Sequence, residues 1–189
     1  RLVGEANDYV GKGINGGLIT VIPPQEVSNK SKQVVLGNTC LYGATGGKLF
    51  ALGRVGERFA VRNSGAQAVV EGSGDHCCEY MTGGIVVILG STGRNVAAGM
   101  TGGVTFLLDE DQRANLRVNK DNVDIFDLTT PEQELLIKPL LESHVKETDS
   151  NKAKEILLDW EFWSKKFKVL VPPSERVKVG LAKKETVAV

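Results

Sequence analysis

A glycine pair followed by an apolar strand, Gly83-Gly84-IVVIL, recurs through the first half of this 189-residue chain. Three more copies read Gly16-Gly17-LITVI, Gly46-Gly47-KLFAL and Gly102-Gly103-VTFLL, and a weaker one reads Gly65-Ala66-QAVVE. The second residues of the last four pairs stand at 47, 66, 84 and 103, so the steps are 19, 18 and 19 residues. A near-constant period of this size indicates a solenoid, in which each repeat is stable only when it is stacked on its neighbours.

The longer step, from Gly17 to Gly47, contains the polar segment QEVSNKSKQ at 25–33, which we expect to be a looped-out insertion. A Pro-Pro step ends the strand before it, because proline cannot donate to a strand ladder. Runs such as Phe59-Ala60-Val61 are too short for helices and suit buried strands. Two such strands per repeat predict one coil of a parallel β-helix. A β-propeller blade, which needs about twice the length, is the alternative.

After the last repeat the pattern changes to helices. Val123-Asp124-Ile125 suits one more edge strand. Thr130-Pro131-Glu132-Gln133 has the form of a capping box with proline at the first helical position, and Ser150 starts a second amphipathic helix. We expect the two helices to cover the open end of the solenoid, which otherwise exposes unpaired backbone.

The predicted fold is therefore all-β: a parallel β-helix with coils of about 19 residues, followed by C-terminal capping helices. The expected divisions are a glycine-rich β-helix at 1–128, capping helices at 129–170 and a flexible tail at 171–189.

Composition excludes several classes of function. Lys and Arg number 23 and Asp and Glu number 23, so no charge excess argues for nucleic acid or an anionic membrane. No run of 18 apolar residues predicts a membrane span, and no signal-peptide pattern follows Arg1. Three cysteines, two of them adjacent, do not make a disulfide framework and favour a reducing compartment. The first residue is not Met, and we expect a segment of a longer polypeptide.

Two glycine motifs invite a nucleotide-binding interpretation. Residues 11–16 (GKGING) match GxGxxG, but that fingerprint requires a helix after it and a β-branched strand follows here. Residues 43–48 (GATGGK) are one residue short of a P-loop, and Leu49 stands where Ser or Thr should hold magnesium. Both are expected to be solenoid corners.

Asp75-His76-Cys77-Cys78-Glu79 is the one cluster with nucleophile or metal-ligand chemistry. In an extended strand His76 and Cys78 share a side while Cys77 does not, and neighbours at this spacing seldom form a catalytic pair. A zinc site requires spaced cysteines. We expect a small buried thiol and polar groups at a corner.

Other polar and aromatic residues have structural interpretations. Arg54, Glu57, Arg58 and Arg62 suit an exposed or domain-facing row of ion pairs, with an anion site as the weaker alternative. Trp160 and Trp163 suit packing of the terminal helices.

Three stretches carry a family resemblance: GEANDYVGKGINGG (4–17), GERFAVRNSGAQAVVEGSGDHCCEYMTGG (56–84) and GRNVAAGMTGGVTFLLDED (93–111). They closely resemble the C-terminal GXGXG domain of glutamate synthase, over nearly all of residues 1–170. The adjacent Cys77 and Cys78, and the stretch VPPSE at 171–175, favour the ferredoxin-dependent form over the NAD(P)H-dependent forms.

The resemblance implies a right-handed parallel β-helix, which begins some coils before Arg1 in that family. It also implies a parent oxidoreductase acting on CH-NH2 donors. A glutaminase domain would release ammonia, and a barrel domain containing FMN and a 3Fe-4S cluster would make glutamate from 2-oxoglutarate. The β-helix itself would hold no catalytic residue, cofactor ligand or metal.

The first hypothesis is therefore a non-catalytic structural module that holds the glutaminase and synthase domains in register for ammonia assimilation. Its location would be the bacterial or cyanobacterial cytoplasm or the plastid stroma, and its open end could self-associate. The alternative is a β-helix subunit of a formylmethanofuran dehydrogenase-like complex. A third possibility is an enzyme that uses His76 and Cys78.

Overall fold

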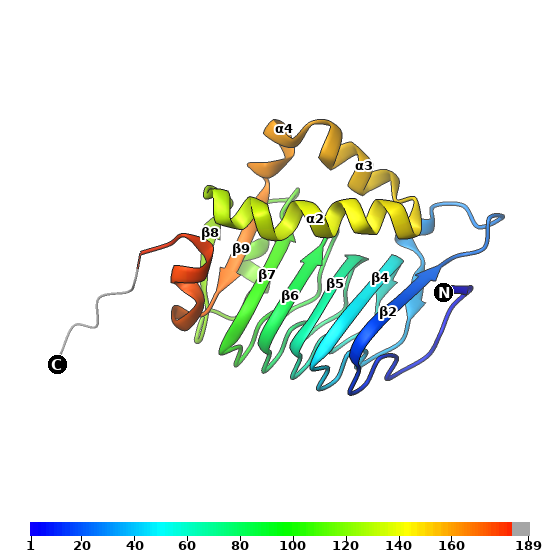
Figure 1. Ribbon diagram of the computed structural model, residues 1–189, viewed down its shortest axis with the longest axis horizontal. Helices are drawn as coiled ribbons and strands as arrows, with labels where there is room; N and C mark the ends of the chain where they lie inside the picture. The colour runs from blue at the N-terminus through cyan, green and yellow to red at the C-terminus, as the bar shows by residue number, and fades with distance from the viewer. Residues whose placement is uncertain (183–189) are drawn as a thin grey trace.

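The computed structural model describes residues 1–182 and shows one large parallel sheet wound into a solenoid, with helices packed on the outside (Figure 1). The strands are β1 (Leu2–Val3), β2 (Asn15–Ile22), β3 (Val34–Leu36), β4 (Gly46–Val55), β5 (Ser64–Gly72), β6 (Thr82–Ile88), β7 (Gly102–Leu108), β8 (Asp124–Asp127) and β9 (Phe167–Val171). The helices are α1 (Ala114–Arg117), α2 (Pro131–Thr148), α3 (Asn151–Leu158), α4 (Trp160–Ser164) and the 3-10 helices η1 (Lys30–Lys32) and η2 (Pro173–Val179).

The sheet order is β1-β2-β4-β5-β6-β7-β9-β8, with β3 also paired to β4. Strands β1 to β7 pair in parallel, as a solenoid requires, and β9 and β8 continue the sheet in antiparallel orientation. The predicted solenoid is confirmed, and the expected edge strand at 123–125 is confirmed as β8. Among residues 1–182, none of the helices has the length and apolar character needed to cross a bilayer.

Strand register sorts the side chains into two cores. Phe50, Val69, Val87 and Phe106 stand side by side on four adjacent strands and face outward. Their sequence neighbours, such as Ala68 and Val70 on β5, face the inside of the coil. Because strand side chains alternate between faces, the sheet is buried on both sides.

Two different steric constraints explain why glycine occupies the two positions of each pair. The second glycine has a positive φ, +88° at Gly84 and +80° at Gly103, which L side chains rarely adopt. At the first glycine of the pairs from Gly46 onward the preceding coil is too close for a side chain. A Cβ on Gly46 would lie 3.0 Å from the carbonyl oxygen of Asn15, and a Cβ on Gly83 would collide with the carbonyl oxygen of Ser64. Each pair is also a place where the strand register shifts.

In each coil, the segment that leads from the end of one sheet strand to the start of the next, here called the return path, differs from the prediction. Phe59-Ala60-Val61 was expected to be a second strand, but Arg58, Ala60 and Arg62 all have positive φ. Turn-like hydrogen bonds, from the Val61 N–H to the Arg58 carbonyl at 3.3 Å, fold the segment, while the Ala60 N–H donates to Cys40 of the preceding coil at 2.9 Å. The apolar side chains are buried as expected, but the backbone reaches that burial by alternating left-handed residues.

The helices also lie elsewhere than expected. Helix α2 runs across the strands on the outer face of the sheet and contacts β2, β4, β5 and β6, so it does not cover the open end of the solenoid (Figure 1). The reason is the outward row that contains Phe50 and Phe106, which would otherwise face water. Antiparallel β9 instead pairs with the far edge of β7. The capping box at Thr130 and Gln133 and the start of α3 after Ser150 are confirmed.

Part of the segment expected to be a flexible tail is ordered. Residues 173–179 form η2, in which Val179 is buried and its carbonyl accepts a 2.7 Å hydrogen bond from the Thr130 hydroxyl. The Pro-Pro step starts η2, and burial of Val179 in the outer core holds it. Residues 183–189 of the expected tail lie outside the described residues.

Candidate functional site

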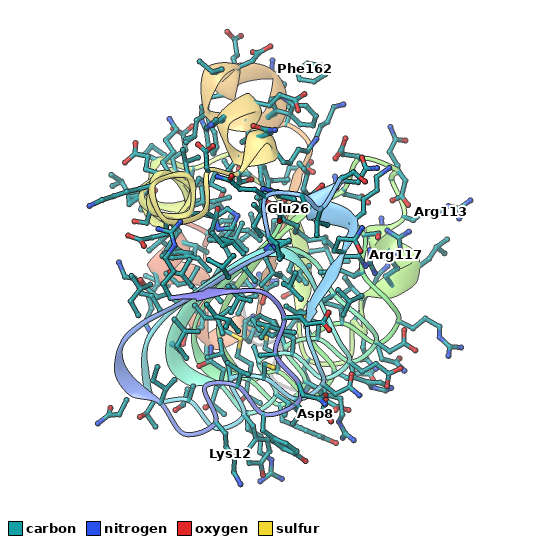
Figure 2. All side chains as sticks on the ribbon, turned by 90° about the vertical axis from the view of Figure 1, so that its right-hand side faces the viewer. Asp8, Lys12, Glu26, Arg113, Arg117 and Phe162 are labelled. Atoms are coloured by element: carbon teal, nitrogen blue, oxygen red, sulfur yellow. The ribbon has the colours of Figure 1, made fainter. Side chains whose placement is uncertain are left out.

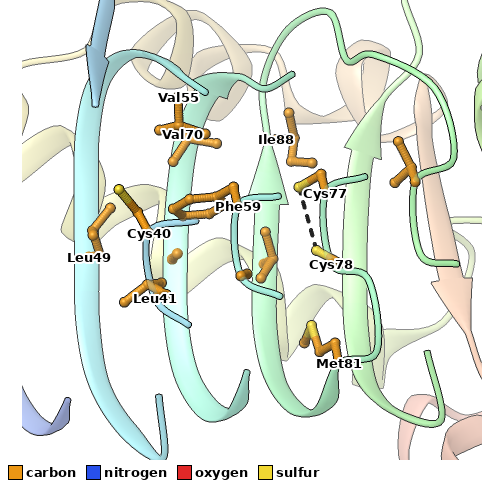
Figure 3. Close-up of a cluster of buried hydrophobic side chains, with 14 of the residues drawn as sticks. Cys40, Leu41, Leu49, Val55, Phe59, Val70, Cys77, Cys78, Met81 and Ile88 are labelled. Atoms are coloured by element: carbon orange, nitrogen blue, oxygen red, sulfur yellow. Dashed lines mark hydrogen bonds between the residues drawn. The ribbon is translucent and has the colours of Figure 1, made fainter. Parts of the chain in front are cut away.

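The segment Asp75–Glu79, the strongest chemical candidate in the sequence, is a solenoid corner. His76, Cys78 and Tyr80 have positive φ, so the alternation of a flat strand does not apply. Cys77 and Cys78 are both fully buried, with sulfur atoms 3.7 Å apart (Figure 3). The His76 side chain, by contrast, is 37% exposed. The expected grouping of His76 with Cys78 on one side is therefore wrong, because the backbone is a series of turns.

The Cys77 thiol of this corner is inert as a nucleophile. The hydrogen bond with Cys78, and burial after it, raise the pKa of Cys77 well above its ordinary value. Burial raises the pKa of the Cys40 thiol, which lies two coils earlier in the chain, to about 11. Since the thiolate is the reactive form, a buried thiol with a raised pKa does not attack substrates near neutral pH.

A small ionic cluster covers the outside of the same corner. Glu79 lies 3.1 Å from the Arg58 guanidinium and 3.4 Å from the His76 ring nitrogen Nδ1. Arg54 turns away from this group and donates to the Ser73 carbonyl at 3.1 Å and to the Ser91 hydroxyl.

The expected ion-pair row of Arg54, Glu57, Arg58 and Arg62 is therefore wrong in its pairing. Arg58 pairs with Glu79, whereas both Glu57 and Arg62 are exposed. Charges one coil apart meet here because the solenoid stacks equivalent positions, whereas neighbours along the chain point in different directions.

A ladder of polar side chains, missed by the sequence analysis, ties consecutive coils together. The Asp8 carboxylate accepts from the Asn38 N–H, the Asn38 amide oxygen accepts from the Glu57 N–H, and Asp75 accepts from the Arg94 N–H, each at 2.8 Å. The bond from the Arg94 N–H lowers the pKa of Asp75. The spacing of these Asp and Asn residues could have predicted the ladder, because each lies one coil before the residue whose N–H it accepts.

A buried polar triad joins the helices to the sheet. The His144 Nε2 on α2 lies 3.1 Å from Oε1 of Glu71 at the end of β5, and the Ser150 hydroxyl, which caps α3, donates to the same oxygen at 2.5 Å. All three side chains are buried, and the Phe50 ring lies 5.8 Å from the His144 ring between centroids. Nothing in the sequence pairs these residues, since they lie 73 and 79 positions apart.

The triad contains a hydroxyl, an imidazole and a carboxylate, but its connections differ from those of a hydrolase. In a catalytic triad the imidazole contacts the nucleophilic hydroxyl and the carboxylate orients the imidazole. Here the carboxylate of Glu71 lies between the other two and accepts from Ser150 directly. With His144 and Ser150 each at 0% exposure, no substrate can reach the hydroxyl, so the arrangement is structural.

The nucleotide motifs are corners, as predicted. Gly11 and Gly13 have positive φ, and the strand β2 follows at Asn15 where a dinucleotide site requires a helix N-terminus. In the second motif Gly46 already begins β4, so Lys48 extends from a strand.

The positions of the three cysteines bear on metal binding. A 3Fe-4S cluster is held by cysteine thiolates, and this chain has three cysteines. Within residues 1–182, however, no three His, Cys, Asp or Glu side chains are grouped closely enough to hold a metal ion. The three thiols therefore do not fit an iron–sulfur cluster.

Trp163 is buried in the apolar core between the helices and the outward face of the sheet, and Trp160 packs against that core, in agreement with the predicted packing role.

Comparison with known proteins decides the family. The family model described as the GXGXG motif matches residues 1–173. The chain belongs to the GXGXG family. It is 58% identical over 176 residues to ferredoxin-dependent glutamate synthase 1 of Arabidopsis thaliana. It is 57% identical, also over 176 residues, to the chloroplastic ferredoxin-dependent glutamate synthase of Spinacia oleracea. A third relative, ferredoxin-dependent glutamate synthase 2 of Synechocystis, is 54% identical over 177 residues.

These matches cover 93% of the chain but about 11% of each relative. The GXGXG segment therefore corresponds to one region of much longer enzymes. The predicted resemblance to glutamate synthase, and to its ferredoxin-dependent form, is confirmed at the level of these relatives.

Proposed function

We propose that this GXGXG segment is a non-catalytic scaffold of a glutamate synthase, which holds the glutaminase and synthase domains in register. In the parent polypeptide, ammonia released from glutamine would reach the synthase site without loss to water. The observation that carries the proposal is 54–58% identity to ferredoxin-dependent glutamate synthases over 93% of the chain. The same identity favours this function over a formylmethanofuran dehydrogenase-like subunit.

The architecture supports a rigid part. Strands β2 to β7 form one continuous ladder, and an apolar core lies on each face of the sheet. Packed interiors resist deformation, so domains attached at different points of the solenoid keep their separation. The buried bond of Glu71 to His144 attaches the helical layer to the same body.

The chemistry of the described residues supports a non-catalytic role. The candidate nucleophiles Cys77 and Cys78 are at 0% exposure, and the Ser150 hydroxyl is equally buried. We assign FMN and the 3Fe-4S cluster of the parent enzyme to parts of the polypeptide outside this segment. The partners proposed are those other domains, together with a second copy that meets the open N-terminal end of the solenoid.

The location proposed is the cytoplasm of a bacterium or cyanobacterium, or the plastid stroma. Its support is that the spinach relative is named as chloroplastic and that another relative belongs to Synechocystis.

An activity assay on the purified chain tests the non-catalytic claim. The chain receives glutamine, 2-oxoglutarate, FMN and reduced ferredoxin, and both glutamate and ammonia are followed. We expect no turnover above the protein-free control. Turnover that is lost in Cys78→Ala, with folding unchanged, would overturn the proposal. The matched control is Cys40→Ala, which removes a buried thiol from another coil.

A further inference from the structure

One position of each coil, on the side of the solenoid away from the helices, has left-handed backbone in every coil. The members of this corner row have φ between +53° and +65°: Gly13, Gly43, Arg62, Tyr80 and Gly99. Hydrogen bonds align them, because the N–H of each of the first four donates at 2.8–3.2 Å to the residue just before the next member. Lys12, which precedes the first member, extends from the lower side of the molecule in Figure 2, opposite the helices.

Arg62 and Tyr80 occupy positions of the corner row where the backbone favours glycine. Three members of the row are glycine, the residue that adopts positive φ most readily. Lack of space is not the reason, since a Cβ added at Gly13 or Gly43 would meet nothing within 4 Å. A side chain at such a position points out of the molecule. The fold therefore does not require Arg62 or Tyr80, although each raises the energy of the folded chain through its left-handed backbone. Residues held in such conformations cluster at functional sites.

The Tyr80 ring is held in place on the surface. Tyr80 is 52% exposed, and a Cβ on Gly99 would lie 2.5 Å from two carbons of its ring. The ring therefore lies directly over the backbone of Gly99, where the lack of a side chain makes room for it. A tyrosine fixed in this way presents an apolar face and has little conformational entropy to lose when a partner covers it.

Arg62, one coil before Tyr80 in the corner row, is exposed and lacks a charge partner. Arg58 and Arg94, on the return paths of their own coils, each pair with a carboxylate. No carboxylate of residues 1–182 forms an ion pair with Arg62. The planar guanidinium of arginine fits a carboxylate through two parallel hydrogen bonds. Arg62 therefore leaves a carboxylate-binding group free beside the Tyr80 ring.

The pair Arg62 and Tyr80 has the composition of a protein interface. The coils that carry Gly43 and Gly99 stack on either side of it, so the pair does not lie at an open end of the solenoid. Arginine and tyrosine are enriched among the residues that dominate binding between proteins. The equal numbers of acidic and basic residues in the chain give no field that would attract a polyanion such as nucleic acid. A carboxylate on another protein segment is the partner that fits.

We infer that Arg62 and Tyr80 form the docking point for an acidic loop of another domain of the parent polypeptide. An Asp or Glu carboxylate of that loop accepts two hydrogen bonds from Arg62, and the apolar part of the loop covers the Tyr80 ring. The chain matches about 11% of each relative, so the rest of such a polypeptide is large enough to supply the loop. This inference rests on the scaffold function proposed above and names one of its contacts.

Hydroxyl-radical footprinting read by mass spectrometry tests whether Tyr80 is covered. The two samples are the 189-residue chain and a chimera in which it replaces the 177 matching residues of the Synechocystis ferredoxin-dependent glutamate synthase 2. Oxidation of Tyr80 should be several-fold slower in the chimera. Arg62→Glu should restore the fast rate there, because it repels the carboxylate of the loop. Gln112→Glu is the matched control, since Gln112 is also exposed with positive φ but lies between β7 and α1. It should leave Tyr80 protected.

Arg62→Gly separates docking from folding. In the 189-residue chain it should raise the melting temperature by about 2 °C, because glycine adopts the left-handed backbone without the penalty. In the chimera the same substitution should expose Tyr80 to oxidation. A lowered melting temperature of the 189-residue chain would show that Arg62 serves the fold and would overturn the inference.

The chimera also distinguishes failure of the docking point from failure of the scaffold function. Tyr80 that is oxidised equally fast in both samples would overturn the docking point, even where the chimera releases little free ammonia per glutamate formed. Protection of Tyr80 that persists in folded Arg62→Glu would overturn the role of Arg62. Protection that is lost in Arg62→Glu, with the ratio of ammonia to glutamate unchanged, would support the docking point and count against the scaffold function alone.

Discussion

The imidazole of His144 and the carboxylate of Glu71 meet 3.1 Å apart in the layer between helix α2 and the outer face of the sheet. Both side chains are buried, and Glu71 also accepts from Ser150, the N-cap of α3. This contact positions the whole helical layer on the solenoid. The elements that it connects are far apart in the chain and are otherwise held together by apolar packing.

Removal of one partner should destabilise the protein strongly. We expect His144→Ala to lower the free energy of unfolding by about 3 kcal/mol, because it leaves Glu71 buried with one donor fewer and opens a cavity. Urea unfolding followed by tryptophan fluorescence measures the change. Lys165→Ala is the control, since its pairing with Glu161 is exposed and should change stability by less than about 0.5 kcal/mol. Equal effects of the two substitutions would contradict the structural role of His144.

Glycine substitutions separate backbone strain from steric collision. Gly84 combines φ +88° with a carbonyl oxygen of Ala66 in the path of a Cβ, whereas Gly13 has φ +65° and open space. We expect Gly13→Ala to cost about 1 kcal/mol and Gly84→Ala about 3 kcal/mol or more. Thermal or urea unfolding of both variants checks the order. A Gly84→Ala variant as stable as Gly13→Ala would contradict the close stacking of the coils.

The three cysteines should report on unfolding. Cys40, Cys77 and Cys78 are at 0% exposure, so an aqueous thiol reagent should label them only as fast as the chain opens. Labelling of all three should be slow in buffer and rapid in denaturant. Fast labelling of Cys77 in the native state would contradict the placement of the corner in the core.

Alkaline pH should weaken the fold through the buried Cys40 thiol. Burial raises the pKa of Cys40 from 9.0 to about 11 in the folded state. A group with a raised folded pKa contributes its full stability below the unfolded pKa and loses it as pH rises through the folded pKa. Stability should therefore fall between pH 9.0 and about 11, and Cys40→Ala should reduce that slope. An unchanged slope would exclude Cys40 as the titrating group.

The polar ladder predicts a weakening at acid pH. The Arg94 N–H lowers the pKa of Asp75, so this carboxylate contributes stability above its unfolded pKa and loses it as pH falls through the lower folded value. Asp75→Ala should reduce the acid dependence of the melting temperature. Asp121→Ala, an exposed carboxylate outside the ladder, is the control and should leave it unchanged.

Much of the fold was predictable, because its main constraint is periodic. Gly83 is required by a nearby carbonyl and Gly84 by its positive φ. Such a pair recurs in most coils, with Gly65-Ala66 as the exception, and is visible in the sequence. The return path was not predictable in the same way. Residues such as Arg58 and His76 adopt positive φ without being glycine, and local preference gives no sign of it.

The candidate site was predicted in part. The strand that follows residues 11–16, where a dinucleotide site requires a helix, could be predicted from the local sequence around Leu18. The contact of Glu71 with His144 could not be predicted, because 73 residues separate them and tertiary packing alone brings them together. The position of α2 depended on which face of the sheet remained uncovered, and that required the register of four strands.

The most direct test of the scaffold function is a chimera in which this segment replaces the 177 matching residues of the Synechocystis ferredoxin-dependent glutamate synthase 2. The measurement is the ratio of free ammonia released to glutamate formed, with Leu116→Ala as a surface control. The scaffold account predicts a low ratio for the unaltered segment and the control, and a raised ratio when Gly84→Ala loosens the solenoid. A chimera whose ratio stays unchanged in folded Gly84→Ala would contradict it.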